Sequence, residues 1–176
     1  MNEEKTKKPQ WKPTWKECIL YSILGILFVG QIILCFLFYN WAGLDVLLYL
    51  GWAILVVGFG IGWMAHIAFY RRGESPEGES WLQTTVVVDS GIYAVVRHPM
   101  YLIGILYVLT LILISQHWLS VIFGFPIIVF YYLSMRDEEQ SCIEKFGDDY
   151  KHYMQKVPRT NLLVGVIRLI QRRRIG

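Results

Sequence analysis

Residues 91–101 combine several side chains that could do chemistry at a membrane surface. They read Gly-Ile-Tyr-Ala-Val-Val-Arg-His-Pro-Met-Tyr, so two tyrosines, an arginine and a histidine lie at the start of an apolar stretch. Pro99 suits the first position of a helix, where its missing N–H is not needed. The following residues 100–114 carry no charged side chain. Ionisable groups at the mouth of such a span are costly, and their default interpretation is a functional site.

A second polar group lies within residues 136–159, after the last apolar stretch. Glu138 follows that stretch by about one helical turn and is expected to face back toward His98. Glu139, about 100° further round the helix, is expected to be solvated or paired with a lysine. Apolar and aromatic positions recur there at helical spacing and predict a helix packed on the bundle. These positions are Cys142, Ile143, Phe146, Tyr150, Tyr153 and Val157.

The composition predicts the kind of protein that carries these groups. Of the 176 residues 55% are hydrophobic, and the mean hydropathy is +0.39. A soluble domain of this size is less apolar, so we expect an all-α, multi-pass integral membrane protein. The three cysteines are odd in number and lack metal-ligand spacing, so neither a disulfide framework nor a metal site is expected. The expected partners are membrane lipids and a lipophilic substrate rather than nucleic acid.

Four transmembrane helices, or five, are predicted from the apolar runs. The first two span roughly residues 18–39 and 46–69, and the second contains Gly51, Gly58 and Gly62 on nearly one face, where helix backbones can approach closely. Gln31 in the first span is expected to hydrogen-bond a neighbouring helix. The last two spans form a hairpin, roughly 99–114 and 118–135. The predicted regions are a basic tail (1–17), two N-terminal spans (18–70), a catalytic region containing the hairpin (71–160) and an amphipathic basic helix on the membrane surface (161–176).

The distribution of positive charge predicts the orientation. Every Lys and Arg lies in the N-terminal tail, in the connection between the second and third spans, or in the C-terminal region. The connections at 40–45 and 115–117 carry none. By the positive-inside rule, both termini and the candidate site are expected to face the cytoplasm.

The two polar groups together resemble the isoprenylcysteine carboxyl methyltransferase and phospholipid methyltransferase family of membrane enzymes. The family pattern is G-x-Y-x-x-x-RHP-x-Y, a pair of spans, then EE-x(6)-FG-x-x-Y-x-x-Y-x-x-x-VP. Both halves of this pattern are present at the same spacing, and the resemblance covers roughly residues 84–160.

The resemblance implies that S-adenosylmethionine binds in a cytoplasmic pocket formed by the C-terminal half, with S-adenosylhomocysteine as the product. The cofactor contacts implied in this way are Thr85, Val86, Val87, Val88, Tyr93, His98, Pro99, Met100, Tyr101 and Glu138. The chemistry of the residues agrees, since Glu138 suits the cofactor's ammonium group or ribose. The rings of Tyr93 and Tyr101 are of the kind that attracts cations.

The acceptor expected first is the carboxylate of an isoprenylcysteine-like molecule, with Glu138 and Arg136 as catalytic residues. In the carboxyl methyltransferases an arginine one turn before the matching glutamate is associated with the substrate carboxylate. Ser134 occupies that position here, so Ser134, Arg136 and Arg97 are the candidate substrate residues. Arg97 has two further interpretations, a snorkelling side chain at the interface or a contact to cofactor or lipid.

Three other functions remain open at the level of sequence. An amine acceptor, as in phospholipid N-methylation, would first lose a proton, with His98 or Glu138 as the candidate base. Membrane sterol reductases, which use NADPH, share the RHP-x-Y turn, and residues 136–138 echo their Arg-Asp-Glu stretch. A non-catalytic membrane scaffold that kept the fold is the third possibility. The sequence indicates no particular oligomeric state.

Overall fold

Helices form wherever the sequence is continuously apolar, and they account for most of the chain. The computed structural model describes residues 14–72, 87 and 89–175. Within these ranges there are helices and connections but no strand, which confirms the predicted all-α class. The elements are α1 (Trp15–Leu37), α2 (Asp45–Arg72), the short 3₁₀ helix η1 (Gly91–Ala94), α3 (Pro99–Ser115), α4 (Trp118–Phe146), α5 (Asp148–Lys156) and α6 (Leu162–Ile175).

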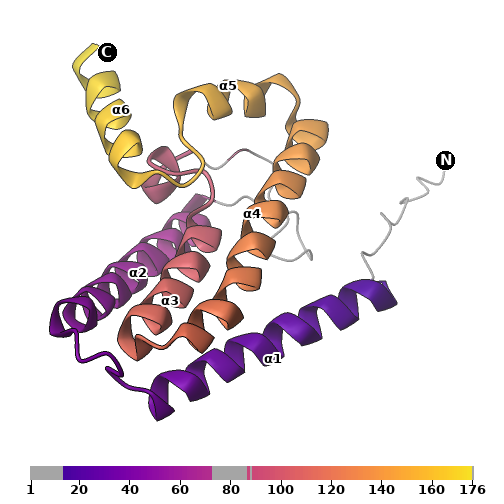
Figure 1. Ribbon diagram of the computed structural model, residues 1–176. Coiled ribbons are helices and arrows are strands. Elements are labelled where there is room, and N and C mark those ends of the chain that lie inside the picture. Colours follow the sequence, from indigo (N-terminus) through magenta and orange to yellow (C-terminus); the bar gives the residue numbers. More distant parts are fainter. Residues whose placement is uncertain (1–13, 73–86, 88, 176) are drawn as a thin grey trace.

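Three of the described helices, α1, α2 and α4, are long and apolar enough to cross a membrane. Helix α3 is apolar as well, but it has only 17 residues. The protein is therefore an integral membrane protein with three clear spans and one shorter apolar helix. In Figure 1, α2, α3 and α4 lie side by side, and α1 runs obliquely to them.

Helix α1 begins earlier than residue 18, the predicted start of the first span. Thr14 and Glu17 form a capping box, in which the Thr14 amide donates to the Glu17 carboxylate at 2.7 Å and the Thr14 hydroxyl accepts from the Glu17 amide at 3.4 Å. This reciprocal pair satisfies backbone donors that a helix start otherwise leaves unpaired. The helix therefore includes Trp15.

The glycines of α2 lie against α3, as the small-residue pattern predicts. A Cβ at Gly51 would come within 2.9 Å of the Ile114 side chain, and one at Gly58 would lie 3.1 Å from the Tyr107 ring. Larger residues at these positions would push the two helices apart. The pair α2–α3 forms the most extensive helix contact in the described bundle.

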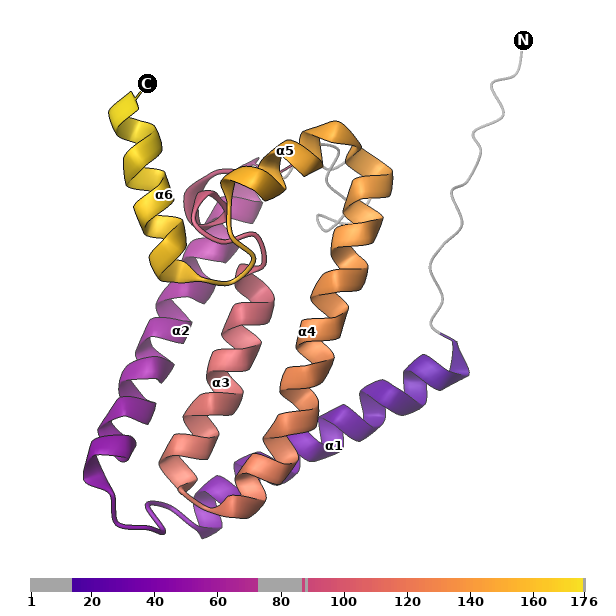
Figure 2. The same ribbon diagram turned by 45° about the horizontal axis from the view of Figure 1, so that its top comes forward.

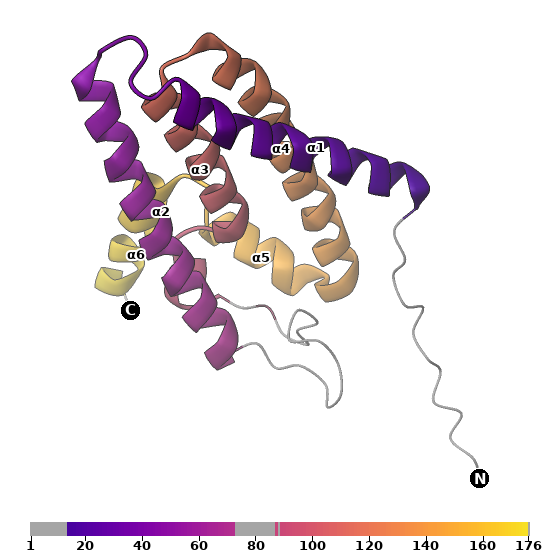
Figure 3. The ribbon, with the colours of Figure 1, turned by 90° about the horizontal axis from the view of Figure 1, so that it is seen from below.

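Gln31 joins α1 to the hairpin formed by α3 and α4. Its side chain is fully buried, and Nε2 donates to the carbonyl oxygens of Val108 at 3.1 Å and Ser120 at 3.2 Å. The expected role of Gln31 as a link between helices is therefore confirmed. Figure 3 shows α1 crossing α3 and α4.

The two connections without Lys or Arg lie together at one end of the bundle. The Asn40 amide donates to the Ile114 carbonyl at 2.9 Å, and the Gln116 side chain bonds both backbone groups of Leu44. Elements η1, α5 and α6 gather at the opposite end, beside the start of α3 (Figure 2). The two charge-free connections thus lie at the end of the bundle opposite η1, α5 and α6.

Helix α4 continues well past residue 135, the predicted end of its span. The chain between Ile127 and Phe146 has no Gly or Pro, and its charged residues are good helix formers. The helix ends at Gly147, which has a φ of 59°. The glutamate pair therefore lies on the same continuous helix as the last span, and α5 turns back across the end of the bundle (Figure 2).

Candidate active site

The two polar groups of the sequence meet through backbone hydrogen bonds. The Arg97 amide donates to the Pro158 carbonyl at 3.0 Å, and the His98 amide donates to the Arg159 carbonyl at 3.1 Å. These bonds join the Arg-His-Pro turn to the Val-Pro-Arg segment that follows α5. The two halves of the quoted pattern therefore form one site at one end of the bundle.

Packing of η1 on α2 fixes the approach to this turn. Ile92 and Val96 are buried in a cluster with Ile61 and Ala65 of α2. Gly91 has a φ of +62°, which an L side chain rarely adopts. The segment that carries Tyr93 is thus held by apolar burial on one side.

His98 lies just before α3, and Pro99 is the first residue of that helix, as predicted. Both residues are buried, whereas Met100 is 60% exposed. Tyr101 is half-buried, and its ring meets the His98 ring edge-on with 5.7 Å between the ring centroids. The structure therefore brings His98 and Tyr101 together and directs Met100 outward.

Glu139 is the centre of the charged cluster, contrary to the expectation that it would be solvated or paired with a lysine. It is only 4% exposed. Its carboxylate lies 3.1 Å from Arg97 Nη1, 3.2 Å from His98 Nε2 and 2.5 Å from Arg159 Nη2. The expectation fails because it assumed an exposed helix face, whereas this face of α4 meets the Arg-His-Pro turn. A buried carboxylate needs such partners.

Arg97 is also buried, so the snorkelling interpretation is wrong. Its side chain is 8% exposed and forms an ion pair with Glu139. The Nε and Nη1 atoms are buried without a hydrogen bond of good geometry. The charge of Arg97 is therefore compensated, while part of its hydrogen-bonding capacity is unused.

Glu138 occupies the open side of the cluster. Its side chain is 47% exposed, and Oε2 lies 3.9 Å from His98 Nδ1, so it faces His98 as predicted. The Tyr101 side chain also lies near Glu138. Burial raises the pKa of Tyr93 to about 12, and the negative charge of Glu138 acts in the same direction. Tyr93 therefore stays protonated near neutral pH.

The imidazole of His98 is kept neutral by its burial. Burial lowers the pKa of His98 below its ordinary value, although the charges of Glu138 and Glu139 favour the protonated ring. The positive charge of Arg97 also lowers this pKa. A neutral imidazole has one donor and one acceptor nitrogen, and which is which depends on its neighbours.

Helix α5 closes the site through aromatic packing. Tyr150, Tyr153 and Val157 are buried in a cluster that Phe146 joins, so the predicted packing role of these aromatic residues is confirmed. The Tyr153 hydroxyl donates to the Tyr93 carbonyl at 2.7 Å. Helix α5 thereby holds the segment before the Arg-His-Pro turn in place.

The remaining predicted site residues are less closely grouped. Ser134 is half-buried and Arg136 exposed, both on α4. Thr85, Val86 and Val88 lie outside the described residues. Val87 is half-buried, and it borders a cleft of about 490 Å³ between α5, Asp89 and Arg172 of α6.

Arg159 is a site residue that the sequence interpretation missed. It donates to Glu139 from Nε at 3.0 Å and from Nη2, and its guanidinium lies 5.6 Å from the centre of the Tyr132 ring. The available signal was its position directly after Val157 and Pro158, the last residues of the quoted pattern. A basic residue at that point can reach back to the buried glutamate.

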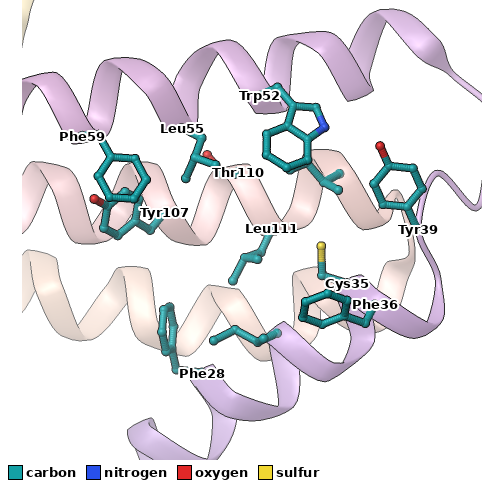
Figure 4. Close-up of a pocket in the computed structure, with 12 residues that line it drawn as sticks. Phe28, Cys35, Phe36, Tyr39, Trp52, Leu55, Phe59, Tyr107, Thr110 and Leu111 are labelled. Atoms are coloured by element: carbon teal, nitrogen blue, oxygen red, sulfur yellow. The ribbon is translucent and has the colours of Figure 1, made fainter.

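A separate apolar cavity of about 360 Å³ lies between α1, α2 and α3, toward the other end of the bundle (Figure 4). It is bordered by residues such as Phe36, Trp52 and Leu111, and it contains no charged group. The chemistry of the charged cluster is absent there. The candidate active site is therefore the cluster around Glu139, not this cavity.

Comparison with known proteins identifies the class of membrane protein that carries this charged, partly open cluster. The model of the phospholipid methyltransferase family matches residues 46–149. That match covers more than half of the chain, so the protein belongs to the phospholipid methyltransferase family. Its matched region includes the Arg-His-Pro turn and both glutamates.

Sequence comparison also finds a curated relative in fission yeast. The chain is 34% identical over 74 residues to the protein-S-isoprenylcysteine O-methyltransferase of Schizosaccharomyces pombe. The aligned region is 42% of this chain and 31% of the yeast protein. The chain thus spans about a third of the length of that relative.

Proposed function

We propose that this protein transfers a methyl group from S-adenosylmethionine to a lipophilic acceptor, and that the acceptor group is the carboxylate of an isoprenylcysteine-like molecule. The observation that carries the proposal is the open carboxylate of Glu138 beside the buried His98 and Tyr101, within the region that matches a membrane methyltransferase family. The relative with isoprenylcysteine activity supports the choice of acceptor.

The residues at the site fit the proposed cofactor. S-adenosylmethionine supplies an electrophilic methyl group on a positively charged sulfur. Glu138 would accept hydrogen bonds from its ammonium group or ribose, and the rings of Tyr93 and Tyr101 would face its cationic part. The unused buried donors of Arg97 are consistent with an anionic group nearby. Pro99, Met100 and residues 85–88 complete the proposed cofactor contacts.

The protein's contribution to methyl transfer is positioning and exclusion of water. An ionised carboxylate is already nucleophilic, so its methylation needs no strong base. Most of the acceleration then comes from alignment of the reacting atoms in a water-poor site. Glu139, Arg97 and Arg159 hold the turn rigidly through buried ion pairs, which provides a fixed frame for that alignment.

Arg136 is the better placed of the arginines that were considered for the acceptor carboxylate. It is exposed on α4, whereas Arg97 is engaged with Glu139 inside the cluster. Ser134, one turn before Glu138, lies where the related enzymes have their arginine. We propose that the site faces the cytoplasm and that the acceptor enters sideways from the bilayer.

Phospholipid N-methylation is a second candidate function, favoured by the description of the matching family. An amine must lose a proton before it can attack the methyl group. His98 is suited to accept it, because burial lowers its pKa and keeps the ring neutral. The family match favours both methyl-transfer functions over the NADPH-dependent reductase alternative.

The two functions are separated by assaying the purified protein in nanodiscs with methyl-labelled cofactor. We expect transfer to a farnesylcysteine analogue and none to phosphatidylethanolamine. Glu138→Gln should reduce the rate at least tenfold, while the exposed Glu144→Gln should not change it. Ser134→Arg should raise the rate, and Arg136→Ala should lower it. Transfer to phosphatidylethanolamine alone would replace the first function by the second.

A further inference from the structure

His98 lies between the carboxylates of Glu139 and Glu138, which are at different distances from its two ring nitrogens. Its Nε2 is 3.2 Å from Glu139 Oε1, whereas its Nδ1 is 3.9 Å from Glu138 Oε2. The first distance is within the range of a hydrogen bond, and the second is beyond it. The His98 side chain is 3% exposed, so water contributes little to its hydrogen bonding.

Glu139 determines which nitrogen of His98 carries the proton. Its carboxylate contacts two guanidinium groups, those of Arg97 and Arg159, and is therefore ionised. An ionised carboxylate accepts hydrogen bonds but donates none. The short contact consequently requires a proton on Nε2. In a neutral ring, Nδ1 then has a free lone pair.

That lone pair leaves two acceptors facing each other across 3.9 Å, His98 Nδ1 and Glu138 Oε2. Neither can donate to the other, so both can accept a hydrogen bond from a donor placed between them. Glu138 is 47% exposed, which makes the gap reachable from outside. A nitrogen placed about 2.8 Å from each acceptor would bridge them with charge-assisted bonds.

We propose that Glu139 is a positioning residue, which fixes the Nε2–H tautomer of His98 so that Nδ1 and Glu138 together bind a primary ammonium group. The inference rests on the proposed function, which supplies two sources of that group. One is the amino-acid end of the cofactor, and the other is the headgroup of an aminophospholipid. Both present an N–H-rich cation of the same size to the paired acceptors.

The tautomer is tested in the protein without ligand by ¹⁵N NMR of ¹⁵N-histidine-labelled protein in detergent at neutral pH. The His98 signals are assigned by their loss in His98→Gln, because His66, His117 and His152 remain. We expect Nε2 to give the shift of a protonated nitrogen and Nδ1 that of an unprotonated one. A proton on Nδ1, alone or on a doubly protonated ring, would overturn the inference. The tautomer is read from the wild-type spectrum, and the His98→Gln variant serves only to assign the His98 signals.

Binding measurements then show whether the bound ammonium group comes from the cofactor or from a lipid headgroup. S-adenosylhomocysteine should bind wild type at least tenfold more tightly than its analogue with hydrogen in place of the amino group. Glu139→Gln should reduce that ratio, and Glu144→Gln should leave it unchanged. If the ratio is near one but phosphatidylethanolamine shifts the Nδ1 signal where phosphatidylcholine does not, the ammonium belongs to the lipid.

The outcomes separate this inference from the proposed function. Tight binding of both cofactor analogues, with no response to either lipid, would overturn the ammonium site and leave methyl transfer standing. Failure of every adenosyl ligand to bind would instead contradict the proposed function. Glu139→Gln also disturbs Arg97 and Arg159. If Glu139 sets the amino-group preference through His98, the effect on that preference should nevertheless be reproduced by His98→Gln.

Discussion

Glu139 accepts two hydrogen bonds from Arg159, one from Nε at 3.0 Å and one from Nη2 at 2.5 Å. These two hydrogen bonds attach the segment that follows α5 to the end of α4 that is predicted to face the cytoplasm. The same carboxylate contacts Arg97 and His98, so one buried side chain connects three separate parts of the chain. Replacement of Glu139 should therefore disturb all three of these parts.

Glu139→Gln should lower the free energy of unfolding by about 3 kcal/mol. The change leaves the buried guanidinium of Arg97 and the partly exposed one of Arg159 without their counter-charge. Glu144→Gln, an exposed change on the same helix, is the matched control and should have little effect. Thermal denaturation in detergent measures both. Equal melting temperatures for the two variants would show that the cluster does not hold the fold together.

Gly165→Ala should loosen α6 from the segment before the Arg-His-Pro turn. A Cβ at Gly165 would lie 2.0 Å from the Val95 carbonyl oxygen, which is backbone and cannot move aside. Such overpacking costs about 1–3 kcal/mol. Gly60→Ala is the control, since a Cβ there meets nothing within 4 Å. A melting temperature for Gly165→Ala as high as that of Gly60→Ala would contradict the observed docking of α6.

The stability contributed by His98 should depend on pH in a defined direction. Burial lowers the pKa of His98 from 6.5, so the unfolded chain takes up a proton more readily than the folded one. The contribution is therefore present above about pH 6.5 and is lost as the pH falls through the lower folded value. The groups facing the ring are Glu138, Glu139, Arg97 and Tyr101.

The comparison that checks this is the melting temperature of wild type minus that of His98→Gln, measured between about pH 7.5 and pH 5. Because glutamine does not titrate, this difference isolates the histidine, and it should shrink as the solution becomes more acidic. A difference that grows toward acidic pH would mean that a charged imidazolium is stabilised by the two glutamates.

We predict the orientation in the membrane from the charge-free connections. In a variant without native cysteines, Trp118→Cys at the start of α4 should react with an impermeant maleimide from outside the cell. Lys151→Cys on α5 should react only after permeabilisation. Both native side chains are well exposed, at 64% and 57%, so reactivity reports sidedness rather than burial. Labelling of position 151 from outside would reverse the proposed topology.

The sequence was sufficient where a local pattern determines the structure. Small residues at Gly51 and Gly58 predicted that another helix approaches α2 closely on that face, and the structure shows that this helix is α3. Pro99 predicted the start of α3, because proline is tolerated best at a helix start. Both features depend on residues within one or two turns.

Sequence patterns did not predict the contacts that Glu139 makes with residues that lie far away along the chain. The environment of Glu139 is decided by Arg97 and by Arg159, which lies 20 positions later, after a helix and a turn. Helical periodicity assigns Glu139 to a face but cannot say what covers it. The predicted span ends near residue 135, whereas α4 continues to Phe146, because a change from apolar to charged residues marks the membrane surface and not the end of a helix.

The most direct test of methyl-donor chemistry is the thermal stability of the purified protein with S-adenosylhomocysteine or with NADPH. A ligand that binds only the folded state raises stability with its concentration. We predict that S-adenosylhomocysteine raises the melting temperature, that this rise is smaller in His98→Ala and Tyr101→Phe, and that NADPH causes no change. An unchanged melting temperature at millimolar S-adenosylhomocysteine, together with a rise caused by NADPH, would contradict it.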